Sequence, residues 1–166
     1  IIPKVVGVDK DQRQPGLQKV QFIKTCPECG AELVRFEGEA AHYCPNDNAC
    51  PPQIKGRIEH FISRKAMNID GLGPQVVDLL INEGKIKSIC DLYTLKVEDI
   101  ENLDRMGKKS AENLVEAISA TKERGLEKLL FALGIRQVGE VAAEEIAKKM
   151  RTLSALLEAT VDDFLA

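Results

Sequence analysis

The amino-acid sequence predicts a mainly α-helical protein, and three observations lead to that class. Apolar residues make up 44% of the chain, yet only 4% of residues are aromatic and Trp is absent, so a core has to rely on aliphatic side chains. From about residue 56 onward, apolar residues recur at helical spacing between short gaps that contain glycine. One motif in this region occurs three times at a nearly fixed interval, which indicates a repeat architecture.

The first part of the chain is expected to be β-like. The stretches "IIPKVVGV" (residues 1–8) and "KVQFI" (residues 19–23) read as strands, and the polar loop "DKDQRQPG" separates them. The first stretch begins without a preceding turn or cap, and the first residue is Ile. We therefore expect the sequence to be a piece of a longer protein.

Four of the five cysteines follow within a short segment. Cys26 and Cys29 form a CxxC followed by Gly30, fourteen residues separate Cys29 from Cys44, and five separate Cys44 from Cys50. Four thiolates match the tetrahedral coordination of zinc and leave no open position, so a structural rather than a catalytic zinc is predicted. Two disulfides or a redox CxxC are the alternatives, but nothing indicates secretion and a redox pair would not need the other two cysteines.

Four other residues have predicted roles as well. Gly30 is expected to take a positive φ, as turns of this kind often do. His42 is a weaker candidate for a zinc ligand because the four cysteines already complete the coordination shell. Cys90 lies on an apolar helical stripe and is predicted to be a small buried hydrophobe, and His60 is predicted to be a surface or packing residue rather than a ligand.

An internal repeat occupies the helical region. The segments "IDGLGPQVVDLL", "LDRMGKKSAENL" and "IRQVGEVAAEEI" align so that one glycine superposes at intervals of 34 and 32 residues: Gly73, Gly107 and Gly139. A second alignment pairs residues 88–100 with residues 152–164, at an offset of 64. The region is therefore expected to contain three units and the start of a fourth.

The glycine turns have two interpretations. Glycine ends helices well, and helical repeats can serve purely as protein-interaction modules. Alternatively, these are helix–hairpin–helix units, whose pattern is apolar-x-Gly-apolar-Gly. In such a unit the free N–H groups at the start of the second helix, together with the helix dipole, favour an anion. A DNA phosphate fits this site and carries no sequence information.

The side chains around each hairpin indicate how well it suits a phosphate. The candidate DNA-binding residues are Gly71, Gly73, Arg105, Gly107, Lys108, Lys109, Arg136 and Gly139. Cations at a helix start oppose the helix dipole unless an anion binds, so the second unit, with Lys108 and Lys109, is predicted to be the strongest site. The first unit offers a backbone-only site, and the third is the weakest because Glu140 follows its glycine.

Only the first unit keeps both glycines. Arg105 and Gln137 occupy the first-glycine positions of the other two units, which departs from the pattern of a tight turn. At the second glycine, Gly107, we expect a positive φ or a close backbone approach, so Gly107→Val should disrupt the hairpin.

The charge of the chain keeps a second function class open. The formal net charge is −3, from 23 basic and 26 acidic residues, whereas DNA-binding proteins usually present a basic face. Composition is only a sum, and backbone N–H groups bind phosphates without a formal charge. A non-enzymatic module that binds protein therefore remains an alternative. No apolar run approaches the ~18 residues of a membrane span, so no membrane contact is expected.

The order of these elements resembles a known family. A strand ending "IPKVVGV", the finger "CPECG…YCPNDNACP" and the junction "RIEHFISRKAMNIDGLG" resemble the C-terminal half of bacterial NAD-dependent DNA ligase, over nearly the whole chain. The resemblance implies the end of an OB-fold and a linker at residues 1–23, a zinc finger at residues 24–55 and a helix–hairpin–helix domain at residues 56–166. The implied fold class is mainly α, with a tandem helix–hairpin–helix domain after a small four-cysteine zinc finger and a residual OB-fold β-strand.

The resemblance also implies a function. The family seals nicks in duplex DNA in replication and repair, using NAD and Mg²⁺, and a lysine in its N-terminal adenylation domain attacks NAD. No position here matches the family's KxDG lysine, so no catalytic residue is assigned, and the chain alone is expected to be inactive and to bind neither NAD nor Mg²⁺. Another DNA-repair protein with a zinc finger and hairpins is an alternative, although in the recombination-mediator family the hairpin precedes the finger.

The expected partners follow from the same resemblance. They are nicked double-stranded DNA and the missing adenylation and OB-fold domains of the parent chain. The protein is expected to be a monomer in the bacterial cytoplasm, associated with the nucleoid through DNA.

Overall fold

A computed structural model of the protein describes residues 2–165, and residues 1 and 166 of the predicted segments lie outside that range. The chain forms two compact units, Ile1–Pro45 and Asn46–Ala166. All the helices of the described residues belong to the second unit.

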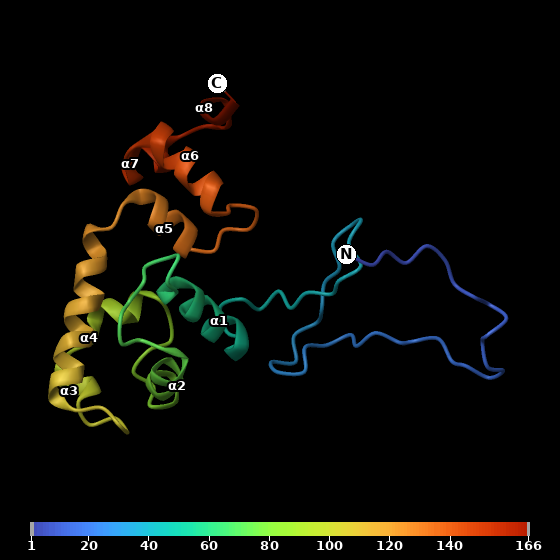
Figure 1. Ribbon diagram of the computed structural model, residues 1–166, viewed down its shortest axis with the longest axis horizontal. Helices are drawn as coiled ribbons and strands as arrows, with labels where there is room; N and C mark the ends of the chain where they lie inside the picture. Colours follow the sequence, from blue (N-terminus) through green and yellow to red (C-terminus); the bar gives the residue numbers. More distant parts are fainter. Residues whose placement is uncertain (1, 166) are drawn as a thin grey trace. The chain divides into compact units, whose positions relative to one another are not determined.

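The described residues of the first unit do not form the predicted strands. Residues 2–24 form only turns and irregular backbone (Figure 1), and Ile2 and Val6 are 94% and 95% exposed. The prediction of a residual OB-fold β-strand is therefore wrong for the described residues. A strand forms only where a second strand satisfies its backbone hydrogen bonds, and among the described residues no β-bridge involves residues 2–24.

The rest of the first unit is held by two isolated antiparallel bridges. Thr25 pairs with Glu32, and Val34 pairs with Tyr43 through reciprocal backbone bonds of 2.8 and 2.7 Å. The Phe36 ring lies 5.4 Å from the Tyr43 ring. The second bridge folds the chain back on itself, so that the residues after Tyr43 return toward the turn that follows Thr25.

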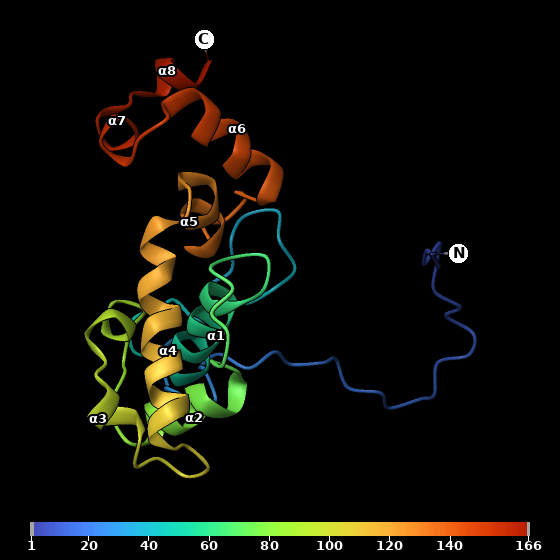
Figure 2. The same ribbon diagram turned by 60° about the vertical axis from the view of Figure 1, so that its left-hand side comes forward.

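The second unit is helical, as predicted. Its α-helices and 3₁₀ helices (η) are α1 (Pro51–Ile62), α2 (Pro74–Asn82), η1 (Cys90–Thr94), α3 (Val97–Ile100), α4 (Lys108–Ala120), η2 (Thr121–Glu123), α5 (Leu126–Ala132), α6 (Glu140–Met150), α7 (Leu153–Glu158) and α8 (Val161–Leu165). Contacts join α1 to α2, α3 to α4, and α5 to α6. Figures 1 and 2 both show α3 beside the start of α4. None of the helices in residues 2–165 is long and apolar enough to cross a membrane.

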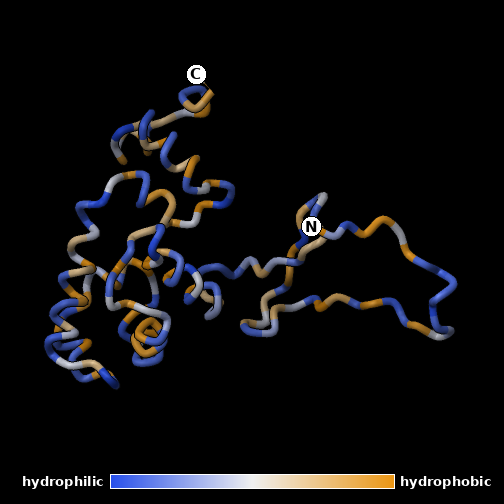
Figure 3. The backbone as a smooth tube through the Cα atoms, in the orientation of Figure 1, coloured by the Kyte–Doolittle hydropathy of each residue, from blue (hydrophilic) through white to orange (hydrophobic). Residues whose placement is uncertain are grey.

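An aliphatic core holds the first two repeat units together. Hydrophobic and hydrophilic residues are interleaved along the helices (Figure 3), and the apolar ones meet in one cluster. Its fully enclosed members include Ile58, Phe61, Leu80, Ile100 and Leu114. The repeat explains which positions are buried, since the small or apolar residue four positions after each repeat glycine is 0% exposed: Val77, Ala111 and Ala143.

The structure also reproduces the second alignment, at an offset of 64 residues. Asp99 accepts a hydrogen bond from the backbone N–H of Lys96 (3.1 Å), and Asp163 accepts one from Thr160 (2.7 Å). In both cases the carboxylate caps a short helix, α3 or α8. The pKa of Asp99 is lowered chiefly by the Lys85 ammonium, and that of Asp163 by the Thr160 N–H. The two short helices therefore share this carboxylate cap at positions that the alignment pairs.

Candidate metal centre and nucleic-acid interface

Four cysteine sulfurs converge at one point. The Sγ atoms of Cys26, Cys29, Cys44 and Cys50 all lie within 4.8 Å of one another, and the Cys29–Cys44 separation is 3.5 Å. Tetrahedral zinc at about 2.3 Å from each sulfur requires sulfur–sulfur distances of about 3.8 Å. The four cysteines are not joined as disulfides. This donor set and spacing fit a closed, structural zinc site, with Cys26 and Cys50 buried and the other two half-buried.

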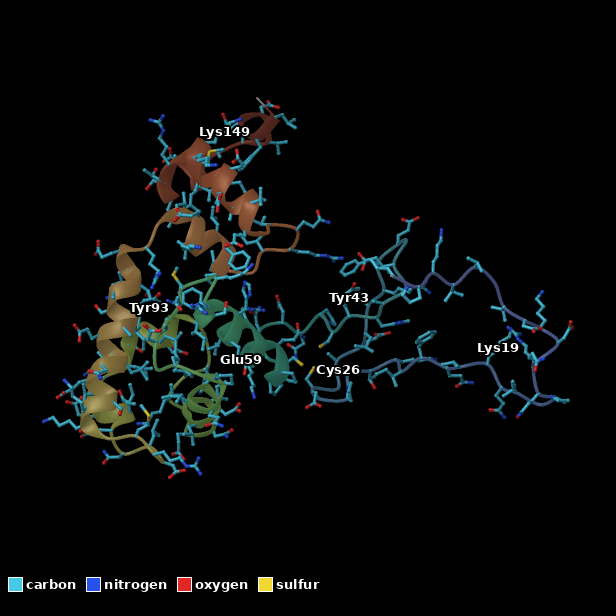
Figure 4. All side chains as sticks on the ribbon, viewed as in Figure 1. Lys19, Cys26, Tyr43, Glu59, Tyr93 and Lys149 are labelled. Carbon is cyan, nitrogen blue, oxygen red and sulfur yellow. The ribbon has the colours of Figure 1, made fainter. Side chains whose placement is uncertain are left out.

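Local backbone turns bring these sulfurs together. Gly30 has the predicted positive φ of 73°, and its N–H donates to the carbonyl of Cys26 (2.9 Å). That turn places Cys29 beside Cys26, which is labelled in Figure 4. The Val34–Tyr43 bridge then leads the chain to Cys44. His42 stacks on Phe22, with ring centroids 5.0 Å apart, and it is not a member of the four-sulfur group.

The three glycine hairpins share one backbone geometry. In each, an N–H donates to the carbonyl three residues earlier, at 3.3, 3.0 and 2.9 Å: Leu72 to Ile69, Met106 to Leu103, and Val138 to Ile135. The third residue of each turn has positive φ, as in a type II turn. These φ values are 81° at Gly71, 61° at Arg105 and 69° at Gln137. The tight turn therefore survives in the second and third units although a non-glycine residue occupies it.

The second glycine of each motif is the residue that begins the next helix. Gly73, Gly107 and Gly139 are the N-caps of α2, α4 and α6, all with extended backbone; φ at Gly107 is −129°. A Cβ added at Gly107 would meet nothing within 4 Å. The expectation of positive φ or close approach within the protein at Gly107 is therefore wrong, because the turn places that requirement two residues earlier.

Glycine at these caps leaves the helix starts without a side-chain acceptor. By contrast, Thr152 caps α7 with its hydroxyl, which accepts from the N–H of Ala155 (3.1 Å). A side-chain cap satisfies one of the amide groups that have no partner within a helix. At the three hairpins, those N–H groups are left to water or to an anion.

The charged residues differ from hairpin to hairpin. Lys108 and Lys109 are exposed at the start of α4, and in the described chain neither forms an ion pair. Arg105 is 85% exposed and lies 3.6 Å from the Asp104 carboxylate. Arg136 is exposed in the third turn. These residues and the three glycine caps remain candidates for phosphate contact.

At the third hairpin, Glu140 has two cationic neighbours that sequence patterns do not reveal. Its carboxylate lies 3.3 Å from the Lys65 ammonium and 3.8 Å from that of Lys128. Lys65 is 75 residues away in the chain, so no local spacing could indicate this cluster.

Two other predictions about single residues have different outcomes. Cys90 is exposed, so its prediction as a buried hydrophobe is wrong. It begins the 3₁₀ helix η1, whose three residues per turn displace a stripe that was read at α-helical spacing. His60 packs as predicted, with Nε2 2.8 Å from the carbonyl oxygen of Phe131 and its ring 5.1 Å from the Phe131 ring.

These features define a protein that joins a four-cysteine zinc finger to tandem helix–hairpin–helix units. Comparison with known families agrees, segment by segment. The family described as "NAD-dependent DNA ligase C4 zinc finger domain" matches residues 25–51. A "SAM-like Helix-hairpin-helix tandem" matches residues 63–120, and a "Helix-hairpin-helix motif" matches residues 128–166.

Individual relatives carry one name. Over 165 residues, 99% of its length, the chain is 61% identical to a DNA ligase of Phocaeicola vulgatus and 56% identical to a DNA ligase of Bacteroides fragilis. It is 48% identical to a DNA ligase of Halothermothrix orenii over 166 residues. In each case the chain spans 25% of the relative's length. The chain thus carries the zinc finger of NAD-dependent DNA ligases and is related along its length to proteins named DNA ligase, which confirms the resemblance.

Proposed function

We propose that this chain is the DNA-binding part of an NAD-dependent DNA ligase, and that it grips the phosphate backbone of nicked duplex DNA. Support comes from the relatives named DNA ligase and from the zinc-finger match. Contacts to phosphates carry no base information, so binding is independent of sequence. Such a grip supplies affinity and position, whereas nick sealing with NAD and Mg²⁺ is assigned to other parts of the parent protein, in the bacterial cytoplasm.

The start of α4 is the observation on which the DNA contact rests. Gly107 caps the helix without a side-chain acceptor, and Lys108 and Lys109 follow it, exposed and without a carboxylate partner in the described chain. Two cations beside the positive end of a helix dipole repel it, typically by about 0.3–1 kcal/mol each. A phosphate removes this repulsion and accepts the amide hydrogen bonds, so the arrangement is favourable only when an anion is bound.

In this proposal the zinc finger is a structural element. Cys26, Cys29, Cys44 and Cys50 are assigned as the four ligands. The segment that carries them has two isolated bridges and few buried side chains, so a metal takes the place of a hydrophobic core. With all four positions filled by sulfur, the metal has no site for substrate and no catalytic role.

The test is a titration of the zinc-loaded chain with a fluorescent nicked duplex at several salt concentrations. Lys108→Ala with Lys109→Ala is expected to weaken binding at least tenfold at 50 mM salt. The slope of log K against log salt should fall by about 0.9 for each phosphate that the protein no longer neutralises. Lys148→Ala with Lys149→Ala is the matched control. It also removes two adjacent lysines, but from the last turn of α6 and not from the start of a hairpin helix.

The outcomes separate DNA binding from the alternatives. Equal weakening by both double variants would mean that only net charge matters, and it would exclude the α4 corner as a specific contact. If the folded, metal-loaded chain does not bind duplex at low salt, the DNA-binding function is refuted, and the protein-interaction module is favoured instead.

A further inference from the structure

The third hairpin contains a carboxylate where the proposed function calls for a phosphate. Glu140 is the first residue of α6, directly after its cap Gly139. The equivalent residue is Lys108 in the second unit and Pro74 in the first. A single acidic side chain at this corner would simply repel DNA, but Glu140 is not alone.

Two lysines from other elements hold this carboxylate. Lys65, in the segment after α1, lies 3.3 Å from Oε2 of Glu140, and Lys128 of α5 lies 3.8 Å from Oε1. Lys128 also donates to the backbone carbonyl of Lys65 at 3.2 Å. The two ammonium groups therefore face one carboxylate from opposite oxygens, an arrangement that also suits two oxygens of a phosphate.

The same region ties the first hairpin to the third. Arg124 donates to the carbonyl of Asn68, just before the first hairpin, at 3.4 Å. Together with Lys128, it attaches the beginning of α5 to the approach of the first hairpin. Helix α5 in turn packs against α6, the helix that Glu140 begins (Figure 1). The backbone of Lys65 is thus held beside α5, and its exposed side chain starts from that fixed position.

The cluster is accessible enough for its anion to be exchanged. The side chains of Lys65, Lys128 and Glu140 are 74%, 35% and 39% exposed. Ion pairs this exposed contribute little to stability, so separating them is inexpensive. A duplex phosphate has the same charge sign and similar oxygen geometry as the carboxylate that it would replace.

We propose that Glu140 is an internal competitor for DNA: it occupies a two-lysine anion site at the third hairpin, and a backbone phosphate displaces it when the duplex binds. The inference rests on the proposed DNA-binding function and adds a regulated third contact to it. The carboxylate offsets one of the two positive charges of Lys65 and Lys128 in the free protein. It thereby lowers affinity and makes the third hairpin engage only when the duplex is already held by the others.

Replacing Glu140 by Gln tests the proposal, because it removes the competing charge and keeps the side-chain shape. Glu140→Gln is expected to raise the affinity of the zinc-loaded 166-residue chain for nicked duplex at least threefold at 50 mM salt. The salt slope should stay close to that of the parent, because a phosphate occupies the two-lysine site in both complexes. Glu116→Gln, the same change at an exposed site on α4, is the control and should leave both quantities within twofold of the parent.

A double-mutant cycle assigns the gain to the two lysines. In the Glu140→Gln background, Lys65→Ala with Lys128→Ala should abolish the gain, and circular dichroism should show that every variant is folded. Affinity that is unchanged or lower in Glu140→Gln, or a gain that persists without the lysines, would overturn the proposal. If the second-hairpin variant loses affinity but Glu140→Gln gains none, only the internal competitor fails. If the parent and Glu140→Gln both ignore DNA, the function itself fails and the competitor with it.

Discussion

Replacing Gly107 by Ser separates the two roles of a helix cap, stability and anion binding. Gly107 has extended backbone (φ −129°, ψ 170°) and room for a Cβ, so serine fits without strain. Its hydroxyl can accept an N–H at the start of α4, as Thr152 does at α7. Serine is a better cap than glycine by a few tenths of a kcal/mol. For a helical unit of this size, the melting temperature should rise by about 1 °C.

DNA binding should change in the opposite direction. The hydroxyl occupies an amide that a phosphate would use, and a hydrogen bond to a charged group contributes about 1.5–3 kcal/mol. Because the hydroxyl can partly move aside, we expect a loss of about 0.6–1.4 kcal/mol, which is about threefold to tenfold in Kd. Fluorescence anisotropy with nicked duplex measures Kd, and differential scanning calorimetry measures stability.

The control makes the same chemical change away from any hairpin. Gly56 is exposed within α1, and a Cβ added there would meet nothing within 4 Å, so Gly56→Ser should alter helix stability slightly and leave Kd unchanged. A Gly107→Ser protein that is more stable and binds duplex as tightly as the parent would refute the idea that free amides at this corner hold phosphate.

Three further substitutions probe the metal centre and the turns. Cys29→Ser should abolish stoichiometric zinc binding, measured by mass spectrometry under native conditions. It should also unfold residues 25–53, while the helical circular dichroism signal of the compact unit Asn46–Ala166 persists. One zinc retained per chain would contradict this. Gly71→Ala places a side chain at a φ of 81° and should destabilise the protein by about 1–2 kcal/mol, whereas Arg105→Gly, at the equivalent position of the second turn, should relieve a similar cost. Unfolding in urea measures both, and equal stability of Gly71→Ala and the parent would show that the turn relaxes.

The parts of the fold that depend on local chemistry could be predicted from the sequence. The helical repeat is one example, because Val77, Ala111 and Ala143 are fixed by spacing from their glycines and all three are fully buried. The convergence of Cys26, Cys29, Cys44 and Cys50 is another, since short cysteine spacings and a CPxCG turn limit where the sulfurs can go.

The parts of the fold that depend on distant neighbours could not be predicted from the sequence. The stretch at residues 2–8 is apolar and Val-rich like a strand, but pairing requires a partner that the local sequence does not contain. The positive φ values at Arg105 and Gln137 accompany the hydrogen bond that closes each turn, against a local preference of about 1–2 kcal/mol. Lys65 lies 75 residues from Glu140 in the chain, so only the tertiary fold brings it to the Glu140 carboxylate.

The matching aspartate caps of α3 and α8 bear on how such a chain is lengthened. The order α2, η1, α3 recurs as α6, α7, α8. The repeating segment therefore includes one hairpin helix and the two short helices that follow it in the chain. A module of this kind adds a hairpin together with the short helices that follow it. The residue after each hairpin glycine can then differ in charge without a change in the surrounding helices. The first helical residue after the hairpin glycine is proline in α2, lysine in α4 and glutamate in α6, so one structural position carries three different charges.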